Sequence, residues 1–249
     1  MAWSHVRNKL SRCKTAGIPG VFAIMGDMNL RAIITGASGM VGEGVLLECL
    51  ENPKVEAVLV LGRKPCGTTH PKMKEVLVKD FLDLTSVENE LRGYNACFFC
   101  AGVSSVGKTE EEFRHLTYDV TMNVANILIK VDPSSAAKMT FTYVTGGGTD
   151  STEKGSVMWA RVKGKTENDL MKLPFKNVFP YRVGYMHPRA GMKHVLTAYK
   201  FITWMYPFVV KILPSYAISL KEVGLSMINA TELDHVKKPL FHKDIRELS

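Results

Sequence analysis

No hydrophobic run in the sequence is long enough to cross a bilayer. The longest uncharged stretch near the C-terminus, residues 201–210, falls short of the roughly 18 to 20 apolar residues that a membrane-spanning helix needs, and Pro207 interrupts it. We therefore expect no transmembrane segment in this chain of 249 residues. With 46% hydrophobic residues, the chain can still bury a full core.

Cysteine is scarce, and its number is odd. The five cysteines lie mostly within apolar segments, which argues against a disulfide framework. This usage indicates a reducing compartment, and we expect the cytoplasm. Cys97 and Cys100 have the spacing of a redox or zinc pair, but residues three apart on a strand point to opposite faces. We therefore expect no metal site.

Acidic residues are outnumbered by basic ones, 24 against 32, which gives a formal net charge of +8. The excess is scattered, and no basic stripe with interleaved aromatic residues is present, so we do not expect nucleic acid as a partner. Part of the excess is expected to line a phosphate-binding pocket.

The first 27 residues lack periodicity and carry four basic side chains against one acid, Asp27. We expect residues 1–27 to be a disordered or non-native extension, and residues 28–249 to form a single domain. A start of translation at Met28, or a remnant of expression, is the preferred explanation of the extension. An organelle transit peptide is the alternative.

Six apolar segments alternate with helical patterns along the rest of the chain. We expect strands at 30–35, 55–61, 76–78, 96–100, 139–144 and 177–183, with helices over about 41–50, 110–131 and 156–173. Strands that are apolar throughout and joined by helices indicate a parallel sheet covered on both faces. The sequence thus predicts an α/β fold, a Rossmann-type doubly wound parallel sheet, with residues from about 186 to 249 forming a small C-terminal lobe.

The first expected strand runs directly into glycines at positions 36, 39 and 42, after which an amphipathic helix begins. Gly36 is expected to allow a tight turn, Gly39 to let the backbone approach a pyrophosphate, and Gly42 to let helix and strand pack closely. A phosphate held here would accept from N–H groups at the helix N-terminus. We expect a dinucleotide to bind the segment Gly36, Ala37, Ser38, Gly39, Met40, Val41 and Gly42.

Arg63 and Lys64 follow the second strand, where an NAD-specific site would carry a ribose-binding acid. A guanidinium at this position would bind a 2′-phosphate through charge-assisted hydrogen bonds. We therefore expect NADP(H) in preference to NAD(H). The alternative is a solvated basic pair that only follows a strand.

Two further strand ends carry candidate cofactor contacts. Asp80 is expected to accept from the adenine amine while Phe81 lies against the ring, although such an aspartate can also merely cap a turn. Ala101 and Gly102 are small enough to let the backbone pass close to the second ribose.

Taken together, these motifs resemble those of the short-chain dehydrogenases/reductases. The set consists of Thr35-Gly-x-x-Gly39-x-x-Gly42, Gly62-Arg63, Asp80, Ala101-Gly102 and Lys163. Its spacing is similar to that of the atypical or extended branch, near the NAD(P)-dependent epimerase/dehydratase group. Residues 144–150 and 162–164 resemble the Tat-interacting-protein-like oxidoreductases of that branch, and the likeness spans about residues 28–230.

The resemblance implies a catalytic Tyr four residues before a Lys that holds the nicotinamide ribose and lowers the Tyr pKa. Lys163 is present, but Trp159 stands where the Tyr is expected, and an indole N–H has no usable acid–base equilibrium near neutral pH. A carbonyl-polarising Ser is expected at the end of the fifth strand. Of the candidates Thr145 and Gly146, only Thr145 carries a hydroxyl.

Two interpretations remain open. In the first, the chain is an oxidoreductase acting on a carbonyl or sugar-nucleotide-type substrate. Its proton donor then comes from elsewhere, with Tyr185, His187 or Tyr143 as candidates. In the second, the chain is a regulator or scaffold that binds NADPH without turnover.

The C-terminal part is expected to build the substrate pocket, for a small molecule with apolar character. Lys193, Lys200 and Lys211 fall on one stripe of an amphipathic pattern that Pro207 must kink or split. We expect this segment to pack on its own domain, with weak contact to a membrane surface as the alternative. The protein is expected to be a monomer or a homodimer.

Overall fold

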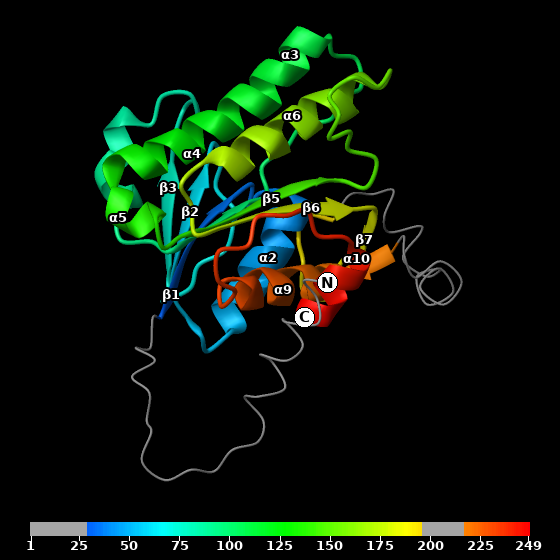
Figure 1. Ribbon diagram of the computed structural model, residues 1–249. Coiled ribbons are helices and arrows are strands. Elements are labelled where there is room, and N and C mark those ends of the chain that lie inside the picture. Colours follow the sequence, from blue (N-terminus) through cyan, green and yellow to red (C-terminus); the bar gives the residue numbers. More distant parts are fainter. Residues whose placement is uncertain (1–28, 196–216) are drawn as a thin grey trace.

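The computed structural model describes residues 29–195 and 217–249, which fold around a six-stranded sheet (Figure 1). The strand order is β3-β2-β1-β4-β5-β6, and every neighbouring pair is parallel. The strands are β1 (Leu30–Thr35), β2 (Val55–Gly62), β3 (Met73–Leu77), β4 (Ala96–Phe99), β5 (Thr140–Gly146) and β6 (Asn177–Val183). This order confirms the expected Rossmann-type α/β fold.

Helices cover both faces of the sheet, as doubly wound topology requires (Figure 1). One face carries α3 (Glu110–Arg114), a π-helical turn (His115–Asp119), α4 (Val120–Val131), α5 (Pro133–Ala136) and α6 (Met158–Lys172). The other face carries α2 (Met40–Glu51), α9 (Leu220–Ala230) and α10 (His242–Leu248). A 3-10 turn (Thr85–Leu91) precedes β4. No helix in the described ranges is both long and apolar enough to span a membrane.

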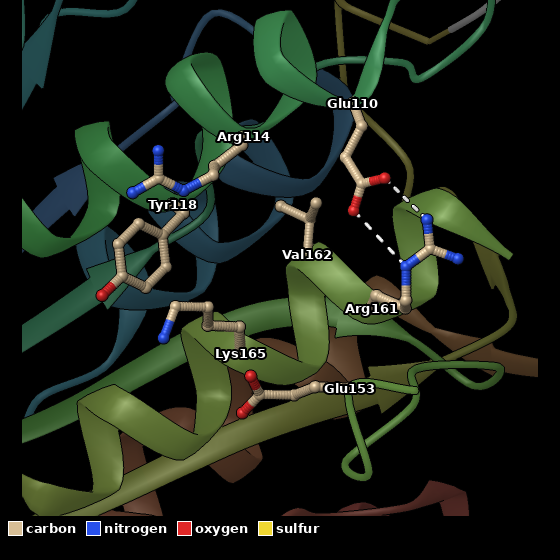
Figure 2. A pocket seen from close by; sticks show the side chains of 7 residues that line it. All are labelled: Glu110, Arg114, Tyr118, Glu153, Arg161, Val162 and Lys165. Carbon is tan, nitrogen blue, oxygen red and sulfur yellow. Dashed lines mark hydrogen bonds and ion pairs between the residues drawn. The ribbon is translucent and has the colours of Figure 1, made fainter. Parts of the chain in front are cut away.

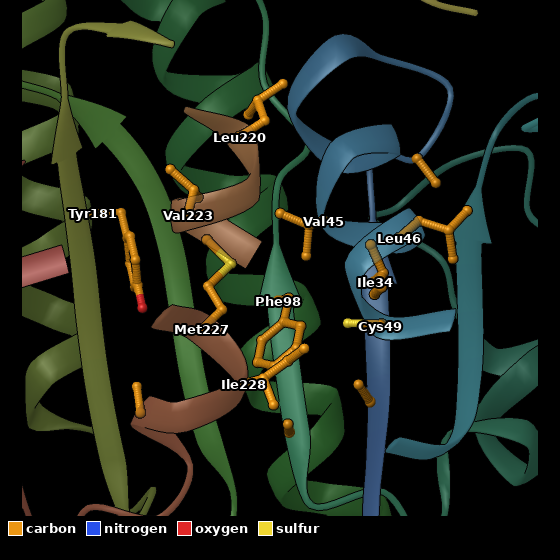
Figure 3. Close-up of a cluster of buried hydrophobic side chains, with 14 of the residues drawn as sticks. Ile34, Val45, Leu46, Cys49, Phe98, Tyr181, Leu220, Val223, Met227 and Ile228 are labelled. Carbon is orange, nitrogen blue, oxygen red and sulfur yellow. The ribbon is translucent and has the colours of Figure 1, made fainter. Parts of the chain in front are cut away.

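The central strands are buried on both sides, which explains their unbroken apolar sequence. Ile33 and Ile34 are both fully buried, yet they belong to different clusters on opposite faces of β1. Figure 3 shows the cluster beneath α2 and α9, in which Val45 and Leu46 of α2 lie with Val223 and Met227 of α9. The two faces of the sheet therefore have separate hydrophobic cores.

Two elements differ from the sequence-based expectation by more than the shift of an end by one or two residues. The third strand covers Met73–Leu77, whereas the sequence predicted residues 76–78. It is an edge strand with an exposed Lys74. Only the residues at its C-terminal end form an apolar run, so only that end was predicted. The helix expected over 110–131 is continuous in extent but contains the π-helical turn, which no sequence pattern predicted.

The described part of the expected C-terminal lobe packs onto the sheet itself. Helix α9 lies against α2, and bridges from Lys237 to Val178 and from Leu240 to Tyr181 run alongside β6. Beyond the end of β6, β7 (Tyr185–His187) pairs with β8 (Ala217–Ser219) in a separate two-stranded sheet. Lys200 and Lys211, the other members of the expected basic stripe, lie outside the described residues.

The segment that leads toward residue 195 is tied to the helix of the glycine motif. Glu43, in the first turn of α2 and 2% exposed, accepts from the backbone N–H groups of Lys193 and His194, each at 2.6 Å. The Glu43 carboxylate therefore joins the glycine-motif helix to the start of the region expected to carry the substrate pocket.

Candidate functional site

The glycine turn between β1 and α2 has the backbone conformation that its sequence predicted. Gly36 has φ of 74°, a left-handed value that an L side chain rarely adopts. A Cβ on Gly42 would lie 2.2 Å from the Gly36 carbonyl oxygen, so only glycine lets the helix approach the turn this closely. Gly39 N–H donates to the Gly36 carbonyl at 2.9 Å and closes the turn.

The N-terminus of α2 has the features of an anion site. Gly39 is its N-cap residue and supplies no side-chain hydrogen bond, so the first N–H groups of the helix lack a side-chain acceptor. Ser38 and Gly39 are exposed there, and a Cβ on Gly39 would meet nothing closer than 3.4 Å. A dinucleotide phosphate fits this position, because it would accept from those N–H groups.

The end of β4 lies directly against the glycine turn. Ala101 N–H donates to the Thr35 hydroxyl at 3.1 Å, and a Cβ on Gly36 would lie 2.7 Å from the Ala101 nitrogen. Gly102 follows in an exposed position with no atom within 4 Å of an added Cβ. The structure thus brings Gly36, Ala101 and Gly102 together, as the carboxyl ends of adjacent parallel strands must be.

Arg63 and Lys64 are exposed where β2 ends, next to β1 in the sheet. Within residues 29–195 and 217–249, neither side chain forms an ion pair. Both cations therefore stay available to an anion near the glycine turn.

Asp80 and Phe81 differ in how well they suit the adenine role. Asp80 is exposed, and its Oδ1 accepts from Leu82 N–H at 3.0 Å, the turn-capping contact that was the alternative interpretation. Its second carboxylate oxygen makes no hydrogen bond to the described residues. The Phe81 side chain is only 7% exposed and packs in the core, so little of its ring can face a ligand.

Trp159 packs on the end of β5 and on the glycine-rich loop that follows it. An added Cβ on Gly146 would lie 3.3 Å from the indole ring, and one on Gly148 would lie 3.2 Å from it. The six-membered edge of the indole therefore covers the backbone of this loop. The glycines at 146 and 148 make room for the tryptophan, so the loop and the ring fit each other.

Sequence reasoning missed a buried polar network beside this loop. Glu167 of α6 is fully buried and binds Arg182 of β6 through three contacts, at 2.5, 3.0 and 3.2 Å. Burial raises the pKa of Glu167, and hydrogen bonds from Arg182 and Thr145 oppose that rise. Glu167 and Arg182 are 15 positions apart, one on a helix and one on a strand. Neither helical nor strand periodicity predicts that two such residues pair.

Thr145 lies inside this network. Its hydroxyl is 2.7 Å from that of Thr149, and both residues are buried. Either hydroxyl can donate to the other. A hydrogen bond from Thr145 also helps to lower the pKa of Glu167, against the effect of burial. The Thr145 hydroxyl therefore already has a buried partner at the end of β5.

The remaining candidates for proton transfer differ in access. Tyr143 is 2% exposed within the core on the α4 side, where burial raises the pKa of its phenol. Tyr185 and His187 lie on β7, and burial lowers the pKa of His187. Lys163 is half-buried on α6, where burial lowers the pKa of its ammonium and the Glu167 charge opposes that shift.

A pocket of about 120 Å³ lies on the outer surface between α3 and α6 (Figure 2). Its cations are neutralised locally: Arg161 binds Glu110 at 2.6 Å, and Lys165 binds Asp169 at 2.9 Å. No group of three or more metal-ligating side chains is found in the described part of the chain. The ends of the parallel strands, where the glycine turn and the Trp159 loop lie, are thus the candidate site.

Sequence comparison gives a family match over most of the sheet. Residues 32–182 match the NAD dependent epimerase/dehydratase family. Protein FMP52, mitochondrial, of Debaryomyces hansenii is 23% identical over 233 residues, which cover 85% of this chain and all of that protein. Leucinostatins biosynthesis cluster protein T of Purpureocillium lilacinum is 26% identical over 147 residues, 58% of this chain. The chain spans only about half (52%) of the length of that relative.

Solved structures give the same architecture. Uronate dehydrogenase from Agrobacterium tumefaciens superposes with a TM-score of 0.61 at 16% identity, over 85% of this chain and 75% of that one. UDP-glucose 4-epimerase from Thermotoga maritima gives 0.59 at 14% identity, over 88% and 81%. At these identities the likeness establishes the fold.

Proposed function

Because the chain belongs to the NAD dependent epimerase/dehydratase family, we propose that it is an NADP(H)-binding oxidoreductase that acts on a carbonyl or a sugar-nucleotide-type substrate. Membership of the family supports chemistry of the oxidoreductase or epimerase type. The cofactor preference, the substrate class and the roles of individual residues are proposals.

The observation that carries this proposal is the glycine turn with the uncapped α2 behind it. Backbone N–H groups of residues 36–42 would hold the pyrophosphate, and Asp80 would bind the adenine amine. Ala101 and Gly102 would border the second ribose, and Lys163 would hold the nicotinamide ribose. Bound nicotinamide supplies or accepts a hydride, and the protein provides orientation and proton transfer.

Arg63 is the proposed determinant of NADPH preference. Arg63→Ala is expected to weaken NADPH binding about tenfold and leave NADH binding almost unchanged, because only NADPH carries the 2′-phosphate. Isothermal titration calorimetry with both cofactors measures the ratio. Lys138→Ala, which removes an exposed cation at the opposite end of the sheet, is the control. An unchanged NADPH to NADH affinity ratio in Arg63→Ala would refute the assignment.

Trp159 favours a second candidate function, a regulator or scaffold that binds NADPH without turnover. Consumption of NADPH by the wild-type protein across a broad panel of carbonyl compounds supports the oxidoreductase. Tight NADPH binding with no turnover on the panel supports the regulator.

Trp159→Tyr separates the two candidates further. The substitution creates the family's Tyr–Lys pair on α6, so it should raise reductase turnover, by about tenfold or more if the phenol acts as a general acid. Trp159→Phe is the matched control, since it supplies a ring of the same shape without the hydroxyl. Activity that appears only in Trp159→Tyr would support a regulator that has lost its acid. Equal activity in both variants would exclude a role for the phenol.

The cytoplasm is the proposed location, on the grounds of cysteine usage. The Debaryomyces hansenii relative is by name a mitochondrial protein, and this makes mitochondria the competing location. Fractionation of cells that produce the full chain separates the two, since recovery in mitochondria would overturn the proposal.

A further inference from the structure

Lys163 lies on the face of α6 that is turned toward the carboxyl end of β5. Trp159, Lys163 and Glu167 are spaced four residues apart, so they share one side of the helix. Trp159 at one end of this row covers Gly146 and Gly148, and Glu167 at the other end binds Arg182 of β6. Lys163 stands between them, beside the strand end where the cofactor is proposed to bind.

The polar side chains near Lys163 already have hydrogen-bond partners. Glu167 is held by Arg182, Thr145 is joined to Thr149, and the indole of Trp159 has no usable acid–base equilibrium. Lys163, in contrast, forms no hydrogen bond or ion pair with residues 29–195 or 217–249. Its ammonium therefore has N–H groups available to a ligand at the end of β5.

We propose that Lys163 is the general acid of this site and donates an Nζ proton to the carbonyl oxygen of the substrate, in place of the absent phenol. This assignment rests on the proposed function above. The carbonyl carbon gains a hydride, with its electron pair, from NADPH, and the carbonyl oxygen gains the Lys163 proton. The C=O group becomes an alcohol, NADPH becomes NADP⁺, and Lys163 is left as a neutral amine that takes a proton from water.

The surroundings of Lys163 favour release of a proton from its ammonium group. Burial lowers the pKa of the ammonium, and the one charge that opposes this shift is Glu167. The charge of Glu167 is in turn balanced by Arg182. Arg161 and Lys165 lie on the opposite side of α6, where Arg161 binds Glu110 (Figure 2) and Lys165 binds Asp169. A lysine shifted toward neutral pH is better matched to acid catalysis than a fully solvated one.

The first test measures proton release by Lys163 without any turnover. Trace labelling with acetic anhydride at a series of pH values, followed by peptide mass spectrometry, gives the labelling midpoint of each lysine. We expect the midpoint of Lys163 to lie at lower pH than that of Lys138, an exposed lysine that is the internal reference. A saturating concentration of NADPH should protect Lys163 from the reagent and leave Lys138 unaffected.

The second test separates acid catalysis from a purely positional role. Lys163→Arg keeps the cation and can still hold a ribose, but a guanidinium does not release its proton near neutral pH. We expect kcat to fall by about 100-fold or more in both Lys163→Arg and Lys163→Met, with NADPH affinity retained in the arginine variant. The wild-type kcat should decline with rising pH as Lys163 loses its proton.

Three results would overturn the assignment. The first is substantial turnover by Lys163→Arg, which would limit Lys163 to holding the cofactor. The second is a Lys163 labelling midpoint equal to that of Lys138. The third is loss of turnover in Tyr185→Phe while Lys163→Arg stays active, which would give the role to Tyr185. Absence of any turnover by the wild-type protein is a different result, because it overturns the proposed function itself.

Discussion

Gly42→Ala is expected to destabilise the fold and to abolish strong NADPH binding together. A Cβ at this position would lie 2.2 Å from the Gly36 carbonyl oxygen and 2.4 Å from its carbonyl carbon. Both atoms are backbone atoms of a turn in which Gly36 already has a left-handed φ, so the turn must move as a whole. We expect a loss of about 3 kcal/mol of unfolding free energy, the upper part of the range for overpacked sites.

Denaturant unfolding of apo protein measures this loss, and calorimetry with NADPH measures the binding. A shift of the turn displaces the N–H groups of α2 from the proposed phosphate position, so affinity should fall by more than about tenfold even where the variant is folded. An unfolding free energy within about 0.5 kcal/mol of wild type would contradict the steric argument.

Gly39→Ala is the matched control, because it adds the same methyl group one turn of the motif away. Its Cβ would meet nothing closer than the Gly36 carbonyl oxygen at 3.4 Å, an ordinary contact. Stability should therefore stay close to wild type. NADPH affinity should still fall, since the methyl group would occupy the exposed position where the pyrophosphate is proposed to lie. Unchanged affinity in Gly39→Ala would place the pyrophosphate elsewhere.

The fold could be read from the sequence because its signals are local. The unbroken apolar strand 30–35 and the three glycines specify one strand, one turn and one helix within about 20 residues, and the structure has these elements. The edge strand was placed less well, since Lys74 and Glu75 interrupt its apolar pattern. Nothing local distinguishes the π-helical turn at 115–119 from the helices on either side.

The candidate site was only partly predictable, because its missing parts depend on contacts across the sheet. The sequence identified Lys163 and the unusual Trp159, but it could not place the indole on Gly146 and Gly148. It also identified Thr145 by its hydroxyl alone, without the Thr149 hydroxyl that lies 2.7 Å from it. The burial of a side chain and its hydrogen-bond partners depend on packing between distant segments. Neither can be predicted from a single sequence.

Glu167→Ala is expected to be the most destabilising substitution of a charged residue in the site. The Glu167 side chain is fully buried, with 0% of its surface accessible to solvent, and the Arg182 side chain is 11% accessible. Removing the carboxylate leaves a guanidinium buried without its counter-charge, a change that typically costs about 3 to 5 kcal/mol. The contact of this carboxylate with Thr145 at the end of β5 would be lost as well.

A double-mutant cycle with Arg182→Met tests the cause of this loss. If the unpaired buried cation is responsible, Glu167→Ala/Arg182→Met should recover about half or more of the stability lost in Glu167→Ala, because no isolated charge remains. Losses that simply add would instead assign the effect to the cavity left by the side chains. Arg182 also donates to the Ser151 hydroxyl, so the cycle is repeated in Ser151→Ala to remove that contact. Since the Glu167 charge opposes the lowering of the Lys163 pKa by burial, the labelling midpoint of Lys163 should move to lower pH in Glu167→Ala. This shift would link the network to the proposed proton donor.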